Sequence, residues 1–120
     1  MKRDYRVYID DILEAVEKIE RYVEGLTFDK FAQDARTIDA VIRNFEIIGE
    51  ATKHITKEVR KEYPNVLWND MAGMRDKLIH EYFGVKLEVV WKTIKKRLPE
   101  VKPLIKEVLE EMDKEISEEV

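Results

Sequence analysis

Cysteine is absent from this chain, glycine (4) and proline (3) are scarce, and no apolar run is long enough to cross a bilayer. The lack of cysteine excludes disulfide frameworks and thiolate metal sites, and it fits a cytoplasmic protein. The scarcity of turn residues disfavours all-β folds and large loop-borne active sites. The first residues lead into no continuous apolar segment, so we expect neither a signal peptide nor a membrane anchor.

Apolar residues make up 44% of the 120 residues, which is enough for one core, so we expect a single domain over residues 1–120. The chain has 26 acidic and 22 basic residues, a formal net charge of −4. Non-specific binding to nucleic acid requires positive charge, so this balance argues against a general coat for DNA or RNA. It leaves room for a local basic cleft.

Apolar residues recur at steps of three and four along almost the whole chain, which predicts amphipathic helices. The first stripe consists of Tyr5, Tyr8, Ile9, Ile12, Leu13, Val16, Ile19 and Val23. We expect Gly25 to end this helix and Thr27 to cap the next one. The second stripe, which should be central to the core, consists of Phe31, Ala35, Ile38, Ile42, Phe45 and Gly49.

The second half of the chain continues this pattern. A short charged segment over residues 56–63 is closed by Pro64, and Asn69 or Asp70 could cap the following helix. That helix should end at Gly84, and Pro99 suits the first turn of a new or kinked helix. The sequence therefore predicts an all-α fold, an antiparallel bundle of four or five helices.

A guanidinium, an imidazole and a phenol lie within residues 75–82, near the end of one of these helices. Asp76 lies four residues before His80, so its carboxylate can reach the imidazole and favour its protonated form. Arg75 and His80 lie five residues apart, roughly 140° around an ideal helix, so they flank one edge of it. One phosphate could meet both only at that edge, or in a groove that a second subunit completes.

These groups suit the attack of a ribose 2′-hydroxyl on the neighbouring phosphate. Histidine can transfer protons near neutral pH, and arginine can hold the phosphoryl oxygens with its planar fork. The reaction needs no metal, and the sequence shows no obvious metal-binding motif, since His54 and His80 are far apart. Taken alone, however, an arginine and a histidine on one helix are more often surface or interface residues.

Two other features have a plain structural interpretation. His54 is expected to be a half-exposed helix residue without a role. A run of basic residues is usually a solvated face, although here it could form the positive wall that an acidic RNA-binding protein needs; the run comprises Lys92, Lys95, Lys96 and Arg97.

Arg75, His80 and Tyr82 fit the RX4HXY pattern of the HEPN superfamily. Residues 39–51, DAVIRNFEIIGEA, resemble the second-helix signature of its HepT-like branch, and residues 68–82, WNDMAGMRDKLIHEY, resemble the motif helix. RX4HXY alone is degenerate. Two such blocks in this order and spacing make the resemblance specific.

The resemblance implies an all-α protein that forms a homodimer through its motif helices, so that two copies of Arg75 and His80 share one cleft. It implies a metal-independent endoribonuclease toxin that cleaves RNA with these two catalytic residues and needs no cofactor. The cognate antitoxin would be a minimal nucleotidyltransferase that transfers AMP from ATP to Tyr82. Asp39, Arg43 and Glu50 match the second-helix pattern and would support the motif helix or the cleft. Asp76 departs from the family, in which this position is often Asn; as a supporting residue it would assist His80 but partly oppose phosphate binding.

Two alternatives stay open at this point. The chain could be a non-catalytic partner that docks the nucleotidyltransferase and carries AMP on Tyr82. It could also be a structural helical bundle with no site at all, in which case Arg75 and His80 would point to bulk solvent.

Overall fold

The computed structural model describes residues 4–80 and 86–119, and for residues 75, 77–80 and 119 it describes the backbone alone. Within these ranges the chain is helical and contains no strand. The elements in chain order are α1 (Arg6–Val23), α2 (Phe28–Gln33), α3 (Ala35–Lys53), α4 (Lys57–Glu62), α5 (Trp68–His80), α6 (Leu87–Lys92), the π-helical turn η1 (Thr93–Arg97) and α7 (Leu98–Glu119). The predicted all-α class is confirmed.

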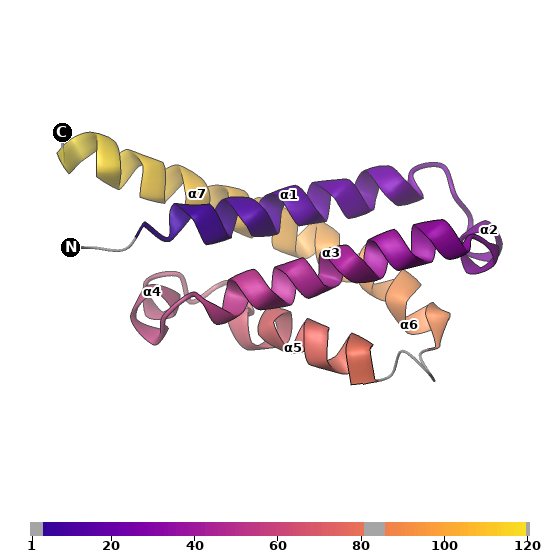
Figure 1. Cartoon of the computed structure of the whole chain (residues 1–120). Helices are drawn as coiled ribbons and strands as arrows, with labels where there is room; N and C mark the ends of the chain where they lie inside the picture. The colour runs from indigo at the N-terminus through magenta and orange to yellow at the C-terminus, as the bar shows by residue number, and fades with distance from the viewer. Residues whose placement is uncertain (1–3, 81–85, 120) are drawn as a thin grey trace.

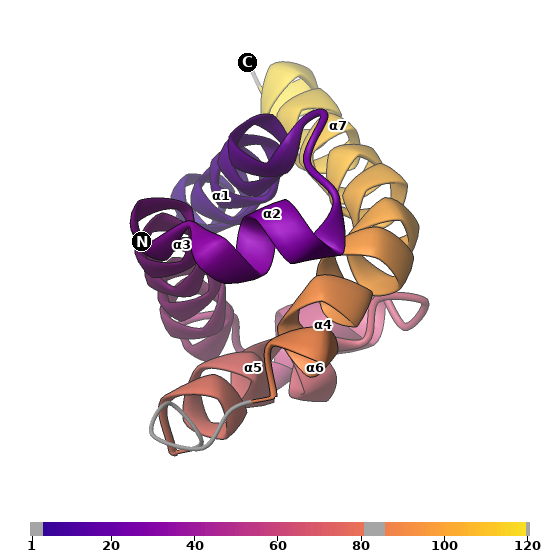
Figure 2. The same ribbon diagram turned by 90° about the vertical axis from the view of Figure 1, so that its right-hand side faces the viewer.

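The four longer helices α1, α3, α5 and α7 run alternately in opposite directions, as an antiparallel bundle requires (Figure 1). Helix α3 packs against α1 on one side and α5 on the other, and α1 also packs against α7. The short helices α2, α4 and α6 lie at the connections between the long ones (Figures 1 and 2). This arrangement leaves α5, the helix with the RX4HXY motif, at one edge of the bundle, held by α3.

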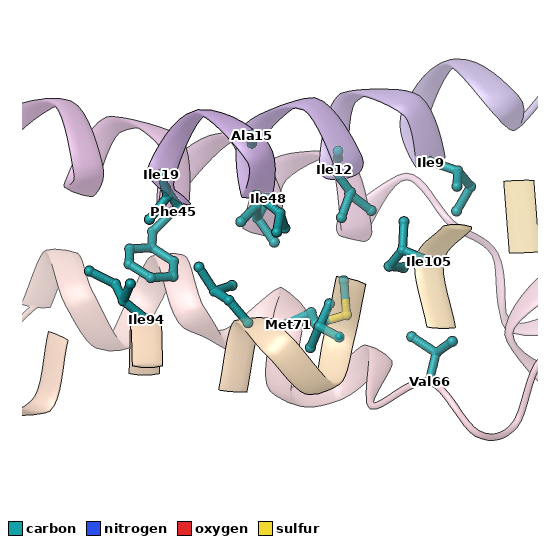
Figure 3. Packing of buried hydrophobic residues seen from close by; sticks show 14 of the residues in the cluster. Ile9, Ile12, Ala15, Ile19, Phe45, Ile48, Val66, Met71, Ile94 and Ile105 are labelled. Carbon is teal, nitrogen blue, oxygen red and sulfur yellow. The ribbon is translucent and has the colours of Figure 1, made fainter. Parts of the chain in front are cut away.

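The core lies between the inward faces of the long helices (Figure 3). Most of the predicted first stripe is buried, while its members Tyr5, Tyr8 and Leu13 are partly buried against the core. Ile12, Phe45 and Met71, from three different helices, are all fully enclosed. Burial of one such side chain contributes about 1.5–3 kcal/mol to folding. The spacing of apolar residues at steps of three and four thus predicted both the helices and the faces on which they pack.

The expected second helix is interrupted at Asp34. The side chain of Thr27 does cap its start, accepting a hydrogen bond from the Lys30 amide at 3.3 Å, but α2 ends after only six residues. Asp34 then caps α3, because its carboxylate accepts bonds from the Thr37 amide at 3.1 Å and the Thr37 hydroxyl at 2.7 Å. A carboxylate that binds the amide three residues ahead favours a new helix start over helix continuation.

Helix α5 begins at Trp68, so the prediction that Asn69 or Asp70 caps it was wrong: both lie inside its first turn. The indole of Trp68 is buried and donates a hydrogen bond to the Tyr63 carbonyl at 3.0 Å, which starts the helix earlier than the polar residues suggest. The expected end of this helix at Gly84 lies outside the described residues.

The start of α7 differs from a simple helix. Pro99 lies in its first turn, as expected, but α6 runs into α7 through η1, where the Leu98 amide donates to the Thr93 carbonyl. A proline in a continuous helix clashes with the carbonyl four residues earlier. The wider π-helical turn before Pro99 shifts the hydrogen-bond register there, and it marks the bend that joins α6 to α7.

Candidate functional site

Helix α5 places Arg75 and His80 on its last two turns. Five residues of helix correspond to a rise of about 7.5 Å along the axis, so the two Cα atoms lie on neighbouring turns at the same end of the molecule. The side chains of Arg75 and His80, and all of Tyr82, lie outside the described residues. Their assignment as catalytic and modified residues therefore stays a prediction.

The start of α5 is anchored by Arg60 on α4, a residue that the sequence patterns did not single out. Its guanidinium donates to the carbonyls of Thr52 at 2.9 Å and Ile55 at 3.0 Å, and to the side-chain oxygen of Asn69 at 3.2 Å. Thr52 lies in the last turn of α3, Ile55 lies just beyond the end of that helix, and Asn69 lies in the first turn of α5. One side chain thus fixes where the motif helix begins relative to the helix that supports it.

Asp76 has a partner that the sequence did not indicate. Its carboxylate lies 3.4 Å from the ammonium of Lys53 at the end of α3, and 61% of the Asp76 side chain is exposed. The expected contact between Asp76 and His80 stays a prediction, because the imidazole is not described. A lysine in the last turn of a helix carries no sequence signal for a partner on another helix, so only the packing of α3 on α5 identifies this pair.

The supporting positions on α3 lie along its exposed face. Arg43 and Glu50 line a groove of about 510 Å³ between α3 and α1, together with His54. Arg43 lies 3.3 Å from Glu46, and the imidazole of His54 lies 3.8 Å from Glu50. Asp39 is exposed one turn before Arg43. A role for these positions in supporting α5 stays a prediction.

His54 is half-exposed, as expected, and it has a structural contact. Its ring stacks on Tyr8 of α1, with 4.8 Å between the ring centroids and 10° between the planes. The contact joins the end of α3 to the start of α1. This explains the residue without assigning it a chemical role.

A second groove, of about 490 Å³, runs between α5 and the segment formed by η1 and α7. Met71, Gly73 and Met74 form part of its α5 wall, and Thr93 and Arg97 lie on the opposite wall. Among the described atoms, none lies within 4 Å of a Cβ added to Gly73. The packing of the described residues therefore does not require glycine at this position of α5.

Burial affects ionisation at the connection that leads into α5. The pKa of Tyr63 is raised to about 12, mainly because its phenol is partly buried, and further because Glu115, Glu111 and Glu62 oppose a second negative charge. The phenol is therefore neutral at physiological pH. Tyr63 acts as a packing residue whose carbonyl receives the Trp68 indole.

Comparison with known proteins places this fold and motif in a family. The model of the ribonuclease HepT-like family matches residues 12–108, which include α3 and α5. The chain therefore belongs to the ribonuclease HepT-like family, as the two sequence blocks suggested.

Several curated proteins are similar over nearly the whole chain. A protein of Thermococcus cleftensis named "Probable ribonuclease HepT" is 48% identical over 102 residues, covering 85% of this chain and 93% of that protein. A protein of Caldanaerobacter subterraneus, also named as an RNase, is 45% identical over 105 residues, covering 88% of this chain and 94% of that protein.

A third relative shows the domain in a longer protein. In Methanocaldococcus jannaschii, a protein named for both a gamma-glutamylcyclotransferase and an RNase is 44% identical over 114 residues, covering 95% of this chain and 51% of that protein. No solved structure matches this chain. In the part of the chain that is described, no helix has the length and apolarity needed to span a membrane.

Proposed function

We propose that this protein is a metal-independent endoribonuclease, the toxin of a toxin–antitoxin pair that acts on RNA in the cytoplasm. Membership of the ribonuclease HepT-like family supports a ribonuclease-type function. The single observation that carries the finer proposal is the position of Arg75 and His80 on neighbouring turns of α5, a helix at the edge of the bundle.

A homodimer formed through α5 would supply the geometry that one helix lacks. Two copies of the helix would bring two imidazoles and two guanidinium groups around one backbone phosphate. One His80 accepts the proton of the ribose 2′-hydroxyl as that oxygen bonds to phosphorus. The other donates a proton to the 5′-oxygen as its bond to phosphorus breaks, and Arg75 holds the charged phosphoryl oxygens.

Tyr82 is the proposed acceptor of AMP from a minimal nucleotidyltransferase. It lies two residues after His80 in the sequence. An added AMP would bring negative charge and bulk close to the catalytic pair, and both would oppose the approach of an RNA phosphate. The same enzyme would then be silenced without any change of fold.

The net charge of −4 favours one further candidate, a non-catalytic partner that docks the nucleotidyltransferase and accepts AMP. That candidate predicts a mass increase on co-expression with the nucleotidyltransferase, lost in Tyr82→Phe, and no RNA cleavage in either state. Cleavage by the unmodified protein would eliminate it.

The test of the nuclease is cleavage of RNA by the purified protein in the presence of a metal chelator. His80→Ala should abolish cleavage and growth arrest while the melting temperature stays unchanged. His54→Ala is the matched control, because it removes the other histidine of the chain and should leave cleavage intact. If His80→Ala cuts RNA as fast as wild type, the proposal is wrong.

A further inference from the structure

Positive charge in this acidic chain is concentrated in one segment. Residues 86–106 contain seven basic and two acidic residues, a net charge of +5, although the whole chain carries −4. The other residues therefore carry −9 together. Such a separation of charge creates a local positive potential that the overall balance hides.

The basic side chains at the centre of this segment point away from the core. Ile94 and Leu98 occupy the inward positions, with 4% and 1% of their surface exposed. Lys92, Lys96 and Arg97 are exposed before and between these two residues. With Lys95, which is also exposed, they place four cations on the outer surface of this segment.

These cations are poorly neutralised. Arg97 lies 3.8 Å from Glu100, with both side chains more than half exposed, so the pair is weak. Among residues 4–80 and 86–119, neither Lys92 nor Lys96 has an ion pair. By contrast, Lys95 lies over the Trp91 ring at 4.8 Å, and Lys102 binds Glu20 at 2.9 Å.

The cationic turn lies beside the motif helix. Arg97 and Thr93 line the groove whose opposite wall includes Gly73 and Met74, the positions just before Arg75. Asp70 and Glu100 also line the groove and would repel phosphate, so a nucleic-acid backbone would follow the outer cationic edge.

We infer that Lys92, Lys96 and Arg97 form a surface that binds the phosphate backbone of RNA and leads it to α5. This inference rests on the proposed ribonuclease function and adds to it the residues that hold the substrate away from the cleavage point. Contacts between cations and phosphates supply affinity without base specificity, and salt weakens them. The surface therefore contributes affinity for RNA without recognising its base sequence.

The test compares two triple variants that have the same net charge of −7. One is K92Q/K96Q/R97Q. The control, K30Q/K57Q/K114Q, neutralises exposed lysines on α2, α4 and the end of α7. Both are made in His80→Ala full-length protein, and binding to a short fluorescent single-stranded RNA is measured by anisotropy at several salt concentrations. Circular dichroism and melting curves confirm that both variants fold.

The first variant should bind RNA about tenfold or more weakly, with a slope of log K against log salt that is shallower by about 2, since each lost phosphate contact accounts for about 0.7. The control should bind like its parent. In the active protein, Arg97→Gln alone should raise KM more than it lowers kcat. Equal RNA affinity of the two triple variants would show that these three residues do not form an RNA-binding surface.

The outcomes separate this inference from the nuclease proposal. If the wild type cleaves RNA and the two triple variants bind RNA equally well, the nuclease proposal stands and the RNA-binding surface is refuted. If only K92Q/K96Q/R97Q loses RNA binding and the wild type does not cleave RNA, the RNA-binding surface stands and the nuclease proposal is refuted.

Discussion

The guanidinium of Arg60 donates a hydrogen bond to the backbone carbonyl of Thr52 over 2.9 Å, closing the end of α3 with a side chain from α4. The last carbonyls of a helix have no partner within the helix, and a cation is favoured there by the helix dipole. Because the same guanidinium also holds Asn69 on α5, this contact sets the position of the motif helix.

Arg60→Ala should therefore lower the free energy of unfolding by about 1–3 kcal/mol, the range for hydrogen bonds that involve a charged group. Arg60→Lys should recover only part of this, since an ammonium cannot reproduce the planar fork. Chemical denaturation measures both effects. Lys61→Ala, at the exposed neighbouring position, is the control, and a loss as large as that of Arg60→Ala would show that the contacts of Arg60 are not the cause.

Gly73 gives a prediction that separates the single chain from the proposed dimer. No atom of the residues that the structure describes lies within 4 Å of an added Cβ, so Gly73→Ala should stabilise the protein by about 0.5–1 kcal/mol through higher helix propensity. Gly73→Gln also suits a helix but has a long side chain. If a second copy of α5 packs here, Gly73→Gln should weaken the dimer in sedimentation experiments, and unchanged dimer affinity would place the interface elsewhere.

Asp34 predicts how the stability of the start of α3 depends on pH. The hydroxyl and amide of Thr37 hold the pKa of this carboxyl below its usual value of 3.8. The pKa of Asp34 is thus lower in the folded state than in the unfolded state. The stabilisation of the fold by the ionised Asp34 carboxylate is therefore fully present above the unfolded pKa, and it is lost as the pH falls through the folded pKa. The stability difference between wild type and Asp34→Ala should be constant at neutral pH and shrink below about pH 4.

Thermal unfolding at several pH values measures this difference. Asp10→Ala, which removes an exposed carboxylate from the second turn of α1, is the control and should show no comparable trend. A difference between wild type and Asp34→Ala that stays constant into strong acid would contradict the capping role.

The pair of Lys53 and Asp76 should contribute little to stability, although it joins α3 to α5. Both side chains are substantially exposed and their charged atoms are 3.4 Å apart, so a double-mutant cycle with Lys53→Gln and Asp76→Asn should give a coupling of about 0.2–1 kcal/mol that falls with added salt. A coupling that is larger and independent of salt would indicate that the pair is buried in an assembly.

Much of the fold followed from residues close together in the chain. The stripe from Tyr5 to Val23 predicted α1, Thr27 was correctly identified as a cap, and Gly25 has the positive φ of 75° that favours glycine after a helix. The break at Asp34 was missed because the apolar spacing continues across it, and a cap inside a periodic run is visible only through its hydrogen bonds. The start of α5 was missed because a buried indole decided it.

The residues of the candidate site fall into the same two groups: those that local sequence patterns predicted and those that only the packing of the helices identified. The order of Arg75, His80 and Tyr82 and the second-helix block identified the family, since those two blocks are local and together specific. Arg60 and Lys53 carry no local pattern. Each meets its partners on other helices, so their roles depend on how α3, α4 and α5 pack.

Local patterns along the chain were enough to predict the helical class, the faces that form the core and the helix that contains the motif, because helix periodicity and caps depend on residues within one or two turns. Which side chains from distant elements meet depends instead on how the helices pack. Arg60 reaches Thr52 and Asn69, Lys53 reaches Asp76, and the cationic turn lies beside α5. These contacts arise from the packing of the whole core, and no short stretch of the chain encodes them.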